Sequence, residues 1–251
     1  MTRSVVATGA AVGIGRAAAE LFAERGHGVV AVDTDGQGLA ALTGTAGPAP
    51  VVPLAGDVTD PEVPEAAVAL ALERFGRLDA VVLNAGIGAT RPLEEPGALE
   101  RFDRIVDVNL RAVALGLRAA LPALRDAQGS AVVTASVSGL AGDPGLWSYN
   151  AAKAGVVNLV RSVALEQAGR GVRVNAVAPG LTDTPRTAPH REDPALAAAL
   201  TARIPLRRWA RAREQAEAIW FLASPAASYI TGAVLPVDGG LTASTGLLAP
   251  P

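Results

Sequence analysis

The sequence contains no cysteine and only two histidines, His27 and His190. Without cysteine there can be no disulfide framework and no zinc site built on thiolates. Two histidines are too few for a histidine-rich metal centre. The sequence therefore predicts that no metal takes part in the structure or the chemistry.

A charge excess and long apolar runs are also lacking. The chain carries 22 basic and 24 acidic residues, a net charge of −2, which gives no general field for attracting nucleic acid. No stretch approaches the roughly eighteen apolar residues that span a bilayer. The N-terminus enters apolar chain without a basic head and a cleavable hydrophobic region. We expect a cytoplasmic protein with no nucleic-acid partner and no membrane partner.

Lysine is almost absent. Lys153 is the only lysine, so the other 21 of the 22 basic residues are arginine. Bias in genomic base composition explains a general excess of arginine, alanine, glycine and proline. It does not explain why a single position remains lysine, and Lys153 is therefore a candidate functional residue.

Hydrophobic residues make up 50% of the 251 positions, enough for a large buried core. Valine-rich runs alternate with longer Ala-rich amphipathic segments, and such runs are typical of strands buried on both faces of a parallel sheet. The expected strands are Ser4 to Thr8, Gly28 to Asp33, Val51 to Ala55, Asp79 to Asn84, Ala131 to Ala135 and Val172 to Ala178. The expected helices include Ile14 to Arg25, Glu62 to Phe75, Leu99 to Leu124 and Tyr149 to Ala168. This alternation predicts a single α/β domain over residues 1–251, a doubly wound parallel sheet of about seven strands flanked by helices.

Two segments interrupt the alternation. Residues 182–208 carry four prolines around a short Ala-Leu helix, and a long insertion at the carboxyl edge of such a sheet predicts a substrate lid. The tail from Leu247 to Pro251 has two interpretations, a frayed end or an arm packed on a neighbouring subunit.

A glycine-rich loop joins the first strand to the first helix and contains Gly9, Gly13 and Gly15. Glycines there permit a tight turn and let backbone amides approach a pyrophosphate at the helix N-terminus. Asp33 ends the second strand 18 residues after Gly15. Its carboxylate can accept hydrogen bonds from both adenosine-ribose hydroxyls and would repel a 2′-phosphate. The sequence therefore predicts binding of NAD rather than NADP.

Four polar residues are candidates for catalysis. Tyr149 and Lys153 are four apart at the start of a helical segment and so share one face. Ser136 precedes Tyr149 by 13 residues at the end of the fifth strand, and Asn109 lies between apolar neighbours inside a long helical segment. A Tyr-x-x-x-Lys pair alone is usually a solvated helix edge. Here, however, the tyrosine is one of two in the chain and the lysine has no other copy.

With these motifs in this order, the chain resembles the short-chain dehydrogenases/reductases of the roughly 250-residue branch, over nearly its whole length. Besides the glycine loop and the four polar residues, the resemblance rests on Asp57-Val58, Leu83-Asn84-Ala85-Gly86, Arg173-Val174-Asn175, Pro179-Gly180 with Thr184, and Asp238-Gly239-Gly240. It implies a Rossmann-like fold and a catalytic tetrad of Asn109, Ser136, Tyr149 and Lys153. It also implies contacts to NAD by Gly9, Gly13, Ile14, Gly15, Asp33, Asp57, Val58, Asn84, Ala85, Gly86, Tyr149, Lys153, Pro179, Gly180, Thr182 and Thr184. Thr182 replaces the aliphatic residue common at its position, although a backbone contact would survive that change.

The implied chemistry suits these residue types. Alcohol oxidation needs a base for the hydroxyl proton while a hydride leaves the same carbon. A free tyrosine has a pKa near 10, and a nearby ammonium such as that of Lys153 favours the ionised form of a phenol. Lysine also suits the ribose hydroxyls as a compact, mobile donor. Ser136 can stabilise charge on the substrate oxygen, and the asparagine position of the family holds a water that passes protons to the lysine.

The expected substrate is a secondary alcohol or the matching ketone. The candidate substrate pocket is mostly apolar, which favours a hydrophobic or cyclic molecule; it comprises Ser136, Val137, Ser138, Leu146, Trp147 and Tyr149. The lid charges Arg186, His190 and Arg191 have two interpretations, solvated loop charges, which we favour, or partners of a substrate carboxylate.

Two other functions remain open. The chain could be a 3-oxoacyl-carrier-protein reductase, although Asp33 disfavours NADPH. In addition, only Arg170 of a carrier-docking arginine pair is present, since Ala127 occupies the other place. A non-enzymatic alternative is an NAD-binding sensor or scaffold.

The helices that start near Leu99 and Tyr149 carry apolar residues on more than one face. Relatives pair these helices across a two-fold axis, and many form tetramers through the last strand and helix. We therefore expect a homotetramer, with a dimer as the fallback.

Overall fold

The computed structural model describes residues 2–44, 47–88 and 92–244. Its centre is a seven-stranded sheet in the order β3-β2-β1-β4-β5-β6-β9, with every neighbouring pair parallel. The strands are β1 Ser4–Thr8, β2 Gly28–Asp33, β3 Val51–Ala55, β4 Ala80–Leu83, β5 Ser130–Thr134, β6 Arg173–Pro179 and β9 Val234–Val237. The prediction of a doubly wound parallel sheet is confirmed.

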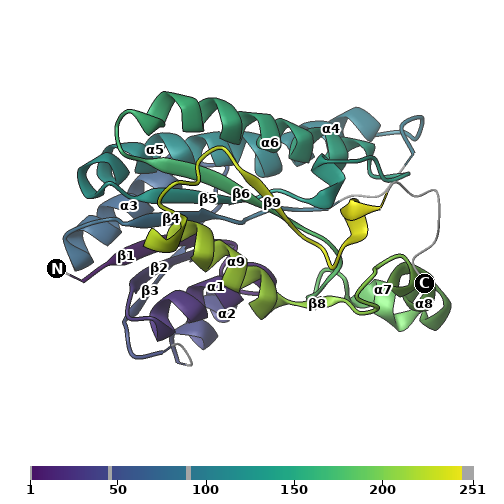
Figure 1. The fold of residues 1–251 in the computed structure, drawn as a ribbon, viewed down its shortest axis with the longest axis horizontal. Coiled ribbons are helices and arrows are strands. Elements are labelled where there is room, and N and C mark those ends of the chain that lie inside the picture. The colour runs from purple at the N-terminus through teal and green to yellow at the C-terminus, as the bar shows by residue number, and fades with distance from the viewer. Residues whose placement is uncertain (1, 45–46, 89–91, 245–251) are drawn as a thin grey trace.

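Helices cover both faces of the sheet (Figure 1). One face carries α1 Gly13–Glu24, α2 Gly36–Thr43 and α9 Ala212–Ala223, and the other carries α3 Glu62–Phe75, α4 Ala98–Val106, α5 Ala112–Ala127 and α6 Trp147–Ala168. Each buried strand supplies both cores, because successive side chains point to opposite faces. In β1, Val6 packs into the core on the α3 and α5 side, while Val5 and Ala7 pack against α1 and α9.

The long helix expected from Leu99 to Leu124 is not one regular α-helix. A π-helical turn, Asp107–Arg111, separates α4 from α5. The Asn109 side chain donates from Nδ2 to the Ile105 carbonyl 3.0 Å away, so a side chain bonds to the backbone of the widened turn. Such turns are frequent at functional sites, and this one carries a tetrad candidate.

The segment expected to form a lid lies beyond the carboxyl edge of the sheet. It contains β7 Thr182–Asp183, α7 Ala188–Glu192, α8 Pro194–Ala202 and β8 Ala210–Arg211, and β7 pairs with β8 in parallel. In Figure 1, α7 and α8 protrude from the main body. Short 3₁₀ turns occur at Val137–Gly139, Pro225–Ala227 and Leu241–Ala243.

The two remaining expectations about the chain concern its tail and membrane insertion. The tail from Leu247 to Pro251 lies outside the described residues. Among the helices that the structure describes, none combines the length and apolarity needed to cross a membrane.

Candidate active site

A cavity of about 650 Å³ opens along the carboxyl ends of the strands. This is where parallel α/β sheets bind ligands, and the volume lies within the range of small-molecule sites. Residues far apart in sequence meet there because all these strands end at one edge. The lining includes most of the predicted site residues: Gly9, Ile14, Asp33, Asp57, Val58, Asn84, Ala85, Gly86, Ser136, Leu146, Tyr149, Lys153, Pro179, Gly180, Thr182 and Thr184.

The glycine loop needs its glycines for conformation and for close packing. Gly9 and Gly13 have φ of +65° and +60°, a region that side chains disfavour. A Cβ on Gly15 would lie 2.0 Å from the Gly9 carbonyl oxygen, so the helix starts against the preceding strand. No side chain caps the N-terminus of α1, and no acidic residue lies in its first turn. The first amides of α1 are therefore suited to an anion such as a pyrophosphate.

Asp33 is held at the end of β2 by two backbone donors. The Ala11 amide donates to its Oδ2 over 3.0 Å and the Asp35 amide to its Oδ1 over 3.1 Å. The oriented carboxylate lines the cavity. It therefore lies where it can accept bonds from a ribose diol and repel an added phosphate.

Asp57 lies near this end of the cavity. The Thr59 amide and hydroxyl donate to its Oδ1 over 3.0 and 2.8 Å. These bonds lower the pKa of Asp57 below its ordinary value, and the group stays ionised at neutral pH.

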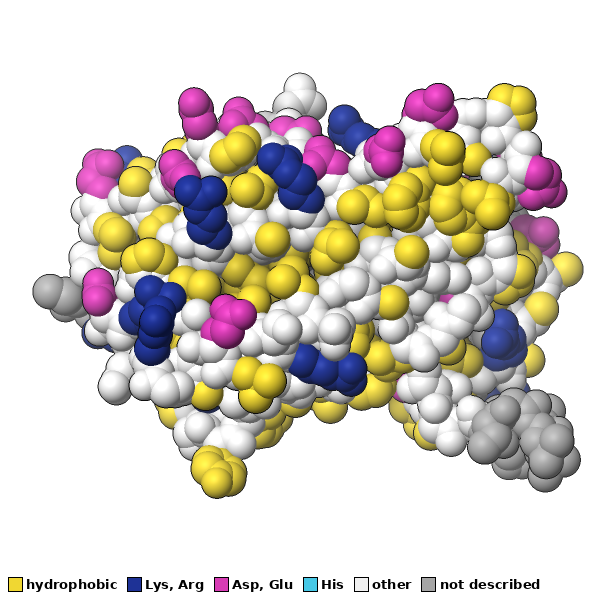
Figure 2. All heavy atoms as spheres, turned by 90° about the horizontal axis from the view of Figure 1, so that it is seen from above, with side chains coloured by type: hydrophobic (Ala, Val, Ile, Leu, Met, Phe, Trp, Pro, Cys, Tyr) yellow, Lys and Arg dark blue, Asp and Glu magenta, His cyan; other side chains and the backbone are white. Residues whose placement is uncertain are grey.

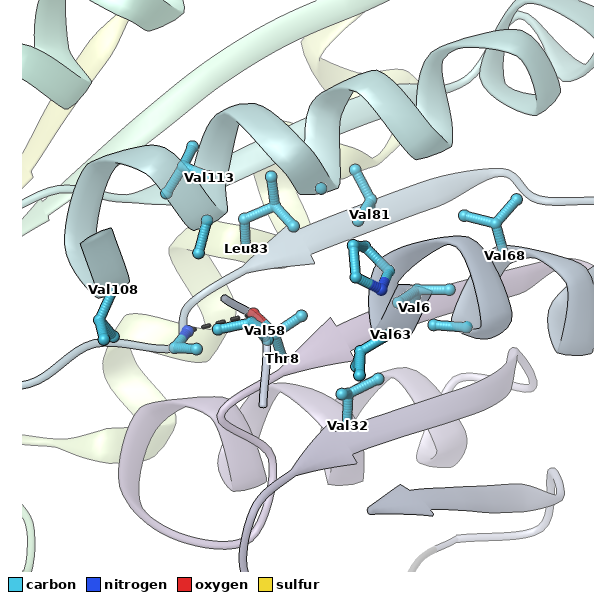
Figure 3. A pocket seen from close by; sticks show the side chains of 15 residues that line it. Val6, Thr8, Val32, Val58, Val63, Val68, Val81, Leu83, Val108 and Val113 are labelled. Atoms are coloured by element: carbon cyan, nitrogen blue, oxygen red, sulfur yellow. Dashed lines mark hydrogen bonds between the residues drawn. The ribbon is translucent and has the colours of Figure 1, made fainter. Parts of the chain in front are cut away.

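Asn84 connects three strands below the cavity. Its amide donates to Thr8 Oγ1 over 3.0 Å, its Nδ2 donates to the Thr8 carbonyl, and its Oδ1 accepts from Thr134 Oγ1 over 3.1 Å. The Ala85 amide also donates to Thr8 Oγ1, which Figure 3 shows. Asn84 thus fixes the floor on which a cofactor would rest.

A second, far smaller cavity lies beneath that floor (Figure 3). It holds about 20 Å³ between the sheet and helices α3 and α5, and valines supply much of its wall. Val58, Ala85 and Val108 line both cavities. Its apolar lining and size mark it as a packing defect of the core rather than a ligand site.

Asn109 is fully buried in the π-helical turn and does not line the large cavity directly. Its Oδ1 accepts from the Ile87 amide over 3.2 Å, and its Nδ2 donates to the Ile87 carbonyl over 3.0 Å. A Cβ on Gly86 would meet Asn109 Oδ1 at 2.6 Å and Lys153 Nζ at 3.7 Å. Gly86 therefore allows the asparagine and the lysine to approach one another.

Lys153 is 3% exposed, and its Nζ donates to the Thr134 carbonyl over 2.7 Å. The same nitrogen lies 5.8 Å from the centre of the Tyr149 ring, as expected for residues on one helical face. Burial, with a smaller contribution from the charge of Arg186, lowers the pKa of Lys153 to about 7. Lys153 can therefore lose its proton near neutrality.

Ser136 caps the 3₁₀ turn after β5. Its Oγ accepts the Ser138 amide over 3.1 Å. Three members of the predicted substrate pocket are absent from the cavity lining: Val137, Ser138 and Trp147. The Ser138 hydroxyl donates to Asp143 over 2.7 Å, and the Trp147 ring stacks on Phe102 at 5.5 Å. Of the predicted substrate pocket, Ser136, Leu146 and Tyr149 therefore line the cavity.

The loop after β6 is fixed by a buried contact that sequence reasoning missed. Thr182 Oγ1 donates to the Gly180 carbonyl over 3.0 Å and accepts from Gln215 Nε2 over 3.1 Å. The same Gln215 nitrogen donates to the Val237 carbonyl over 2.8 Å. Thr182 and Gln215 are thus hydrogen-bond partners. The sequence offered one signal of this contact, a glutamine among the apolar residues on the buried face of α9.

These features together fit a dinucleotide. An uncapped helix start, a carboxylate at one end and a lysine with a tyrosine at the other all face one continuous cavity. Arg186, Thr187 and His190 of the lid segment also line it.

Comparison with known proteins agrees with this geometry. A family model described as enoyl-(acyl carrier protein) reductase matches residues 9–242. The chain is 44% identical over 245 residues to the cis-4-hydroxycyclohexanecarboxylate dehydrogenase of Sinomonas cyclohexanicum, covering 96% of this chain and 97% of the relative. The crystal structure of levodione reductase is similar, with a TM-score of 0.90 at 40% identity over 96% of this chain and 98% of that chain.

A further similar structure is 3-ketoacyl-(acyl-carrier-protein) reductase from Brucella melitensis complexed with NADH. Its TM-score is 0.88 at 36% identity, with 96% of this chain and 98% of that chain covered. The expectations of family, reaction class and cofactor drawn from the sequence are confirmed. The chain belongs to the short-chain dehydrogenase/reductase family and is an NAD-dependent oxidoreductase of alcohols and ketones.

Proposed function

We propose that the enzyme oxidises a hydrophobic, cyclic secondary alcohol to the ketone, reversibly, with Tyr149 as the proton-transfer group. One observation carries the proposal: Ser136, Tyr149 and Lys153 open onto one end of a cavity whose other end carries Asp33. An alcohol beside the tyrosine and a dinucleotide on the glycine loop would then share one space.

Each side chain has a distinct task in this mechanism. Tyr149 takes the hydroxyl proton at its phenol oxygen as the alcohol is oxidised. Because Ser136 Oγ accepts the Ser138 amide, its own proton is available to the substrate oxygen and stabilises charge there. One N–H of the Lys153 ammonium donates to the Thr134 carbonyl. Its other N–H groups donate to the ribose hydroxyls and to the tyrosine. NAD, when bound, supplies the hydride acceptor.

The substrate class is argued from the wall of the pocket and from the relatives. Leu146 and Pro185 give apolar surface at the reaction end of the cavity. Two of the similar proteins are named for cyclic substrates, a hydroxycyclohexanecarboxylate and levodione. Because apolar walls favour molecules with little polar surface, we expect cyclohexanols and cyclic ketones to exceed polyols as substrates.

A panel of substrates tests this proposal. Initial rates with NAD are measured for cyclohexanols, linear alcohols, polyols and 3-hydroxyacyl thioesters. Highest kcat/KM for cyclohexanols supports the proposal. Highest kcat/KM for the thioesters would instead support a 3-oxoacyl-carrier-protein reductase, the second candidate favoured by similarity to the Brucella enzyme. Tight NAD binding without turnover of any alcohol would support a sensor.

We also propose that the chain forms a homotetramer. Leu99 of α4 is 67% exposed and Leu165 of α6 is 83% exposed. Figure 2 shows hydrophobic side chains gathered on this helical face toward the end where α4 lies. Such surface favours association. Light scattering at micromolar concentration should give a tetramer mass, a dimer would support only the pairing of helices, and a monomer would contradict the proposal.

A further inference from the structure

The arginines of the lid segment differ in how their charges are balanced. Arg191 forms an ion pair with Asp183, and Arg208 forms one with Glu214 at 2.7 Å. Arg186 instead donates to a neutral acceptor, the Gly86 carbonyl. It forms no ion pair with any carboxylate in the described part of the chain. Its positive charge therefore faces the cavity without a negative partner.

The cavity is also divided by charge. Its two carboxylates, Asp33 and Asp57, belong to the end expected to hold adenosine, where Arg104 also lines the cavity and lowers the pKa of Asp57. The reaction end carries Lys153, Arg186 and the imidazole of His190, and none of the described lining residues there is acidic. An unbalanced cationic end favours an anionic ligand, because a guanidinium offers two parallel donors that match a carboxylate.

Two anions could meet Arg186: the pyrophosphate of NAD or a carboxylate on the substrate. The pyrophosphate already has a site at the start of α1, where the helix is uncapped and free of acidic residues. Arg186 lies at the Gly86 carbonyl and close enough to Lys153 to lower its pKa, in the segment that also brings Pro185 and His190 to the pocket. The substrate carboxylate is therefore the anion that Arg186 is left to bind.

We propose that Arg186 is a specificity residue that pairs with a carboxylate on the substrate, so that the preferred substrates are cyclic hydroxy acids rather than neutral cyclic alcohols. In this arrangement the hydroxyl lies at Tyr149 and Ser136, the ring lies against Leu146, and the carboxylate extends toward the lid. The inference rests on the proposed function, since it assumes that the alcohol binds at Tyr149. The relative from Sinomonas is named for a substrate of this chemistry.

The first experiment compares matched substrates. Kinetics with NAD are measured for 4-hydroxycyclohexanecarboxylate, for its carboxamide and for 4-methylcyclohexanol, using the parent, Arg186→Gln and Arg203→Gln. Arg203 is an exposed arginine at the end of α8 that does not line the cavity, so it controls for loss of one lid charge. We expect the parent to prefer the acid over the carboxamide by at least about tenfold in kcat/KM, or about 1.4 kcal/mol.

The expected pattern among the variants is specific. Arg186→Gln should lose that preference because the ratio of the KM for the carboxamide to the KM for the acid falls toward one, without a specific rise in the KM for NAD. Any change that the lost charge causes at Lys153 acts on both substrates and cancels in this ratio. Arg203→Gln should keep the preference. Equal use of acid and carboxamide by the parent would overturn the inference. A raised KM for NAD in Arg186→Gln, by the same factor whichever alcohol is used, would also overturn the inference, because the arginine would then bind the pyrophosphate.

A binding measurement separates this inference from the proposed function. Calorimetry of the enzyme–NADH complex with cyclohexanecarboxylate and with cyclohexanecarboxamide needs no turnover. Tighter binding of the carboxylate, lost in Arg186→Gln, supports the inference even if the tested alcohols are not oxidised. Equal affinity for the two ligands overturns it, even if neutral cyclohexanols are good substrates and the proposed function stands.

Discussion

Exchange of Lys153 for arginine keeps a basic residue in a chain that otherwise uses only arginine, yet we expect it to be harmful. The Nζ atom donates to the Thr134 carbonyl at 2.7 Å from a side chain that is only 3% exposed, so the longer, planar guanidinium cannot take its place without displacing its neighbours. Overpacking of this kind costs about 1–3 kcal/mol. The lysine, with its pKa lowered to about 7 by burial, can also shed its charge in the ligand-free protein, whereas arginine cannot.

The Lys153→Arg variant should therefore unfold at lower urea concentration than the parent, with a free energy of unfolding reduced by about 1–3 kcal/mol. A displacement of about 1 Å at the reacting centre can cost on the order of a hundredfold in rate. We expect weaker NAD binding and a kcat lowered at least tenfold, or about 1.4 kcal/mol. Arg161→Lys, the reverse exchange on an exposed position of α6, is the control and should change neither property. Parental stability and kinetics in Lys153→Arg would refute this reasoning.

Three further predictions concern cofactor choice and pH. The parent should prefer NAD to NADP by at least about tenfold in kcat/KM, and Asp33→Ala should reduce this preference mainly by raising the KM for NAD; equal use of both cofactors by the parent would contradict the assignment. In the ligand-free protein the pKa of Lys153 is about 7, below the ordinary 10.5, so the unfolded chain binds more protons between these values. The free energy of unfolding in urea should then rise with pH between these two values in the parent, and this rise should be absent in Lys153→Met. Burial lowers the pKa of His27, so stability should fall as pH drops through about 6.5, and His27→Phe should remove that loss.

The sheet was largely predictable because its signal is local. The first three strands have the bounds expected from their apolar runs. Strands β1 and β2 are buried on both faces, which leaves little room for polar residues, whereas β3 is a partly exposed edge strand. The places of the loop glycines and of Asp33 were predictable for a similar reason, because the glycines directly follow the first strand and Asp33 ends the second. The small pair of β7 and β8, in contrast, depends on contacts between segments distant in sequence.

The details around the tetrad needed the structure. The π-helical turn that carries Asn109 departs from the 3.6-residue period, so the hydrophobic pattern could not reveal it or the side-chain bonds of Asn109 to Ile105 and Ile87. Trp147 turned to stack on Phe102 instead of lining the cavity, a choice set by tertiary packing. Gln215 reaches Thr182 across 33 residues, and no local pattern reports such a pair.

The proton-transfer role of Tyr149 is the central claim, and Tyr149→Phe tests it most directly because only the phenol oxygen is removed. NAD affinity, measured by calorimetry, and kcat for a cyclohexanol, measured by NADH formation, are compared in the same preparations. The account predicts nearly unchanged NAD affinity and a kcat lowered at least about a hundredfold. Turnover close to the parent rate would show that another group transfers the proton and that the tetrad is wrongly assigned.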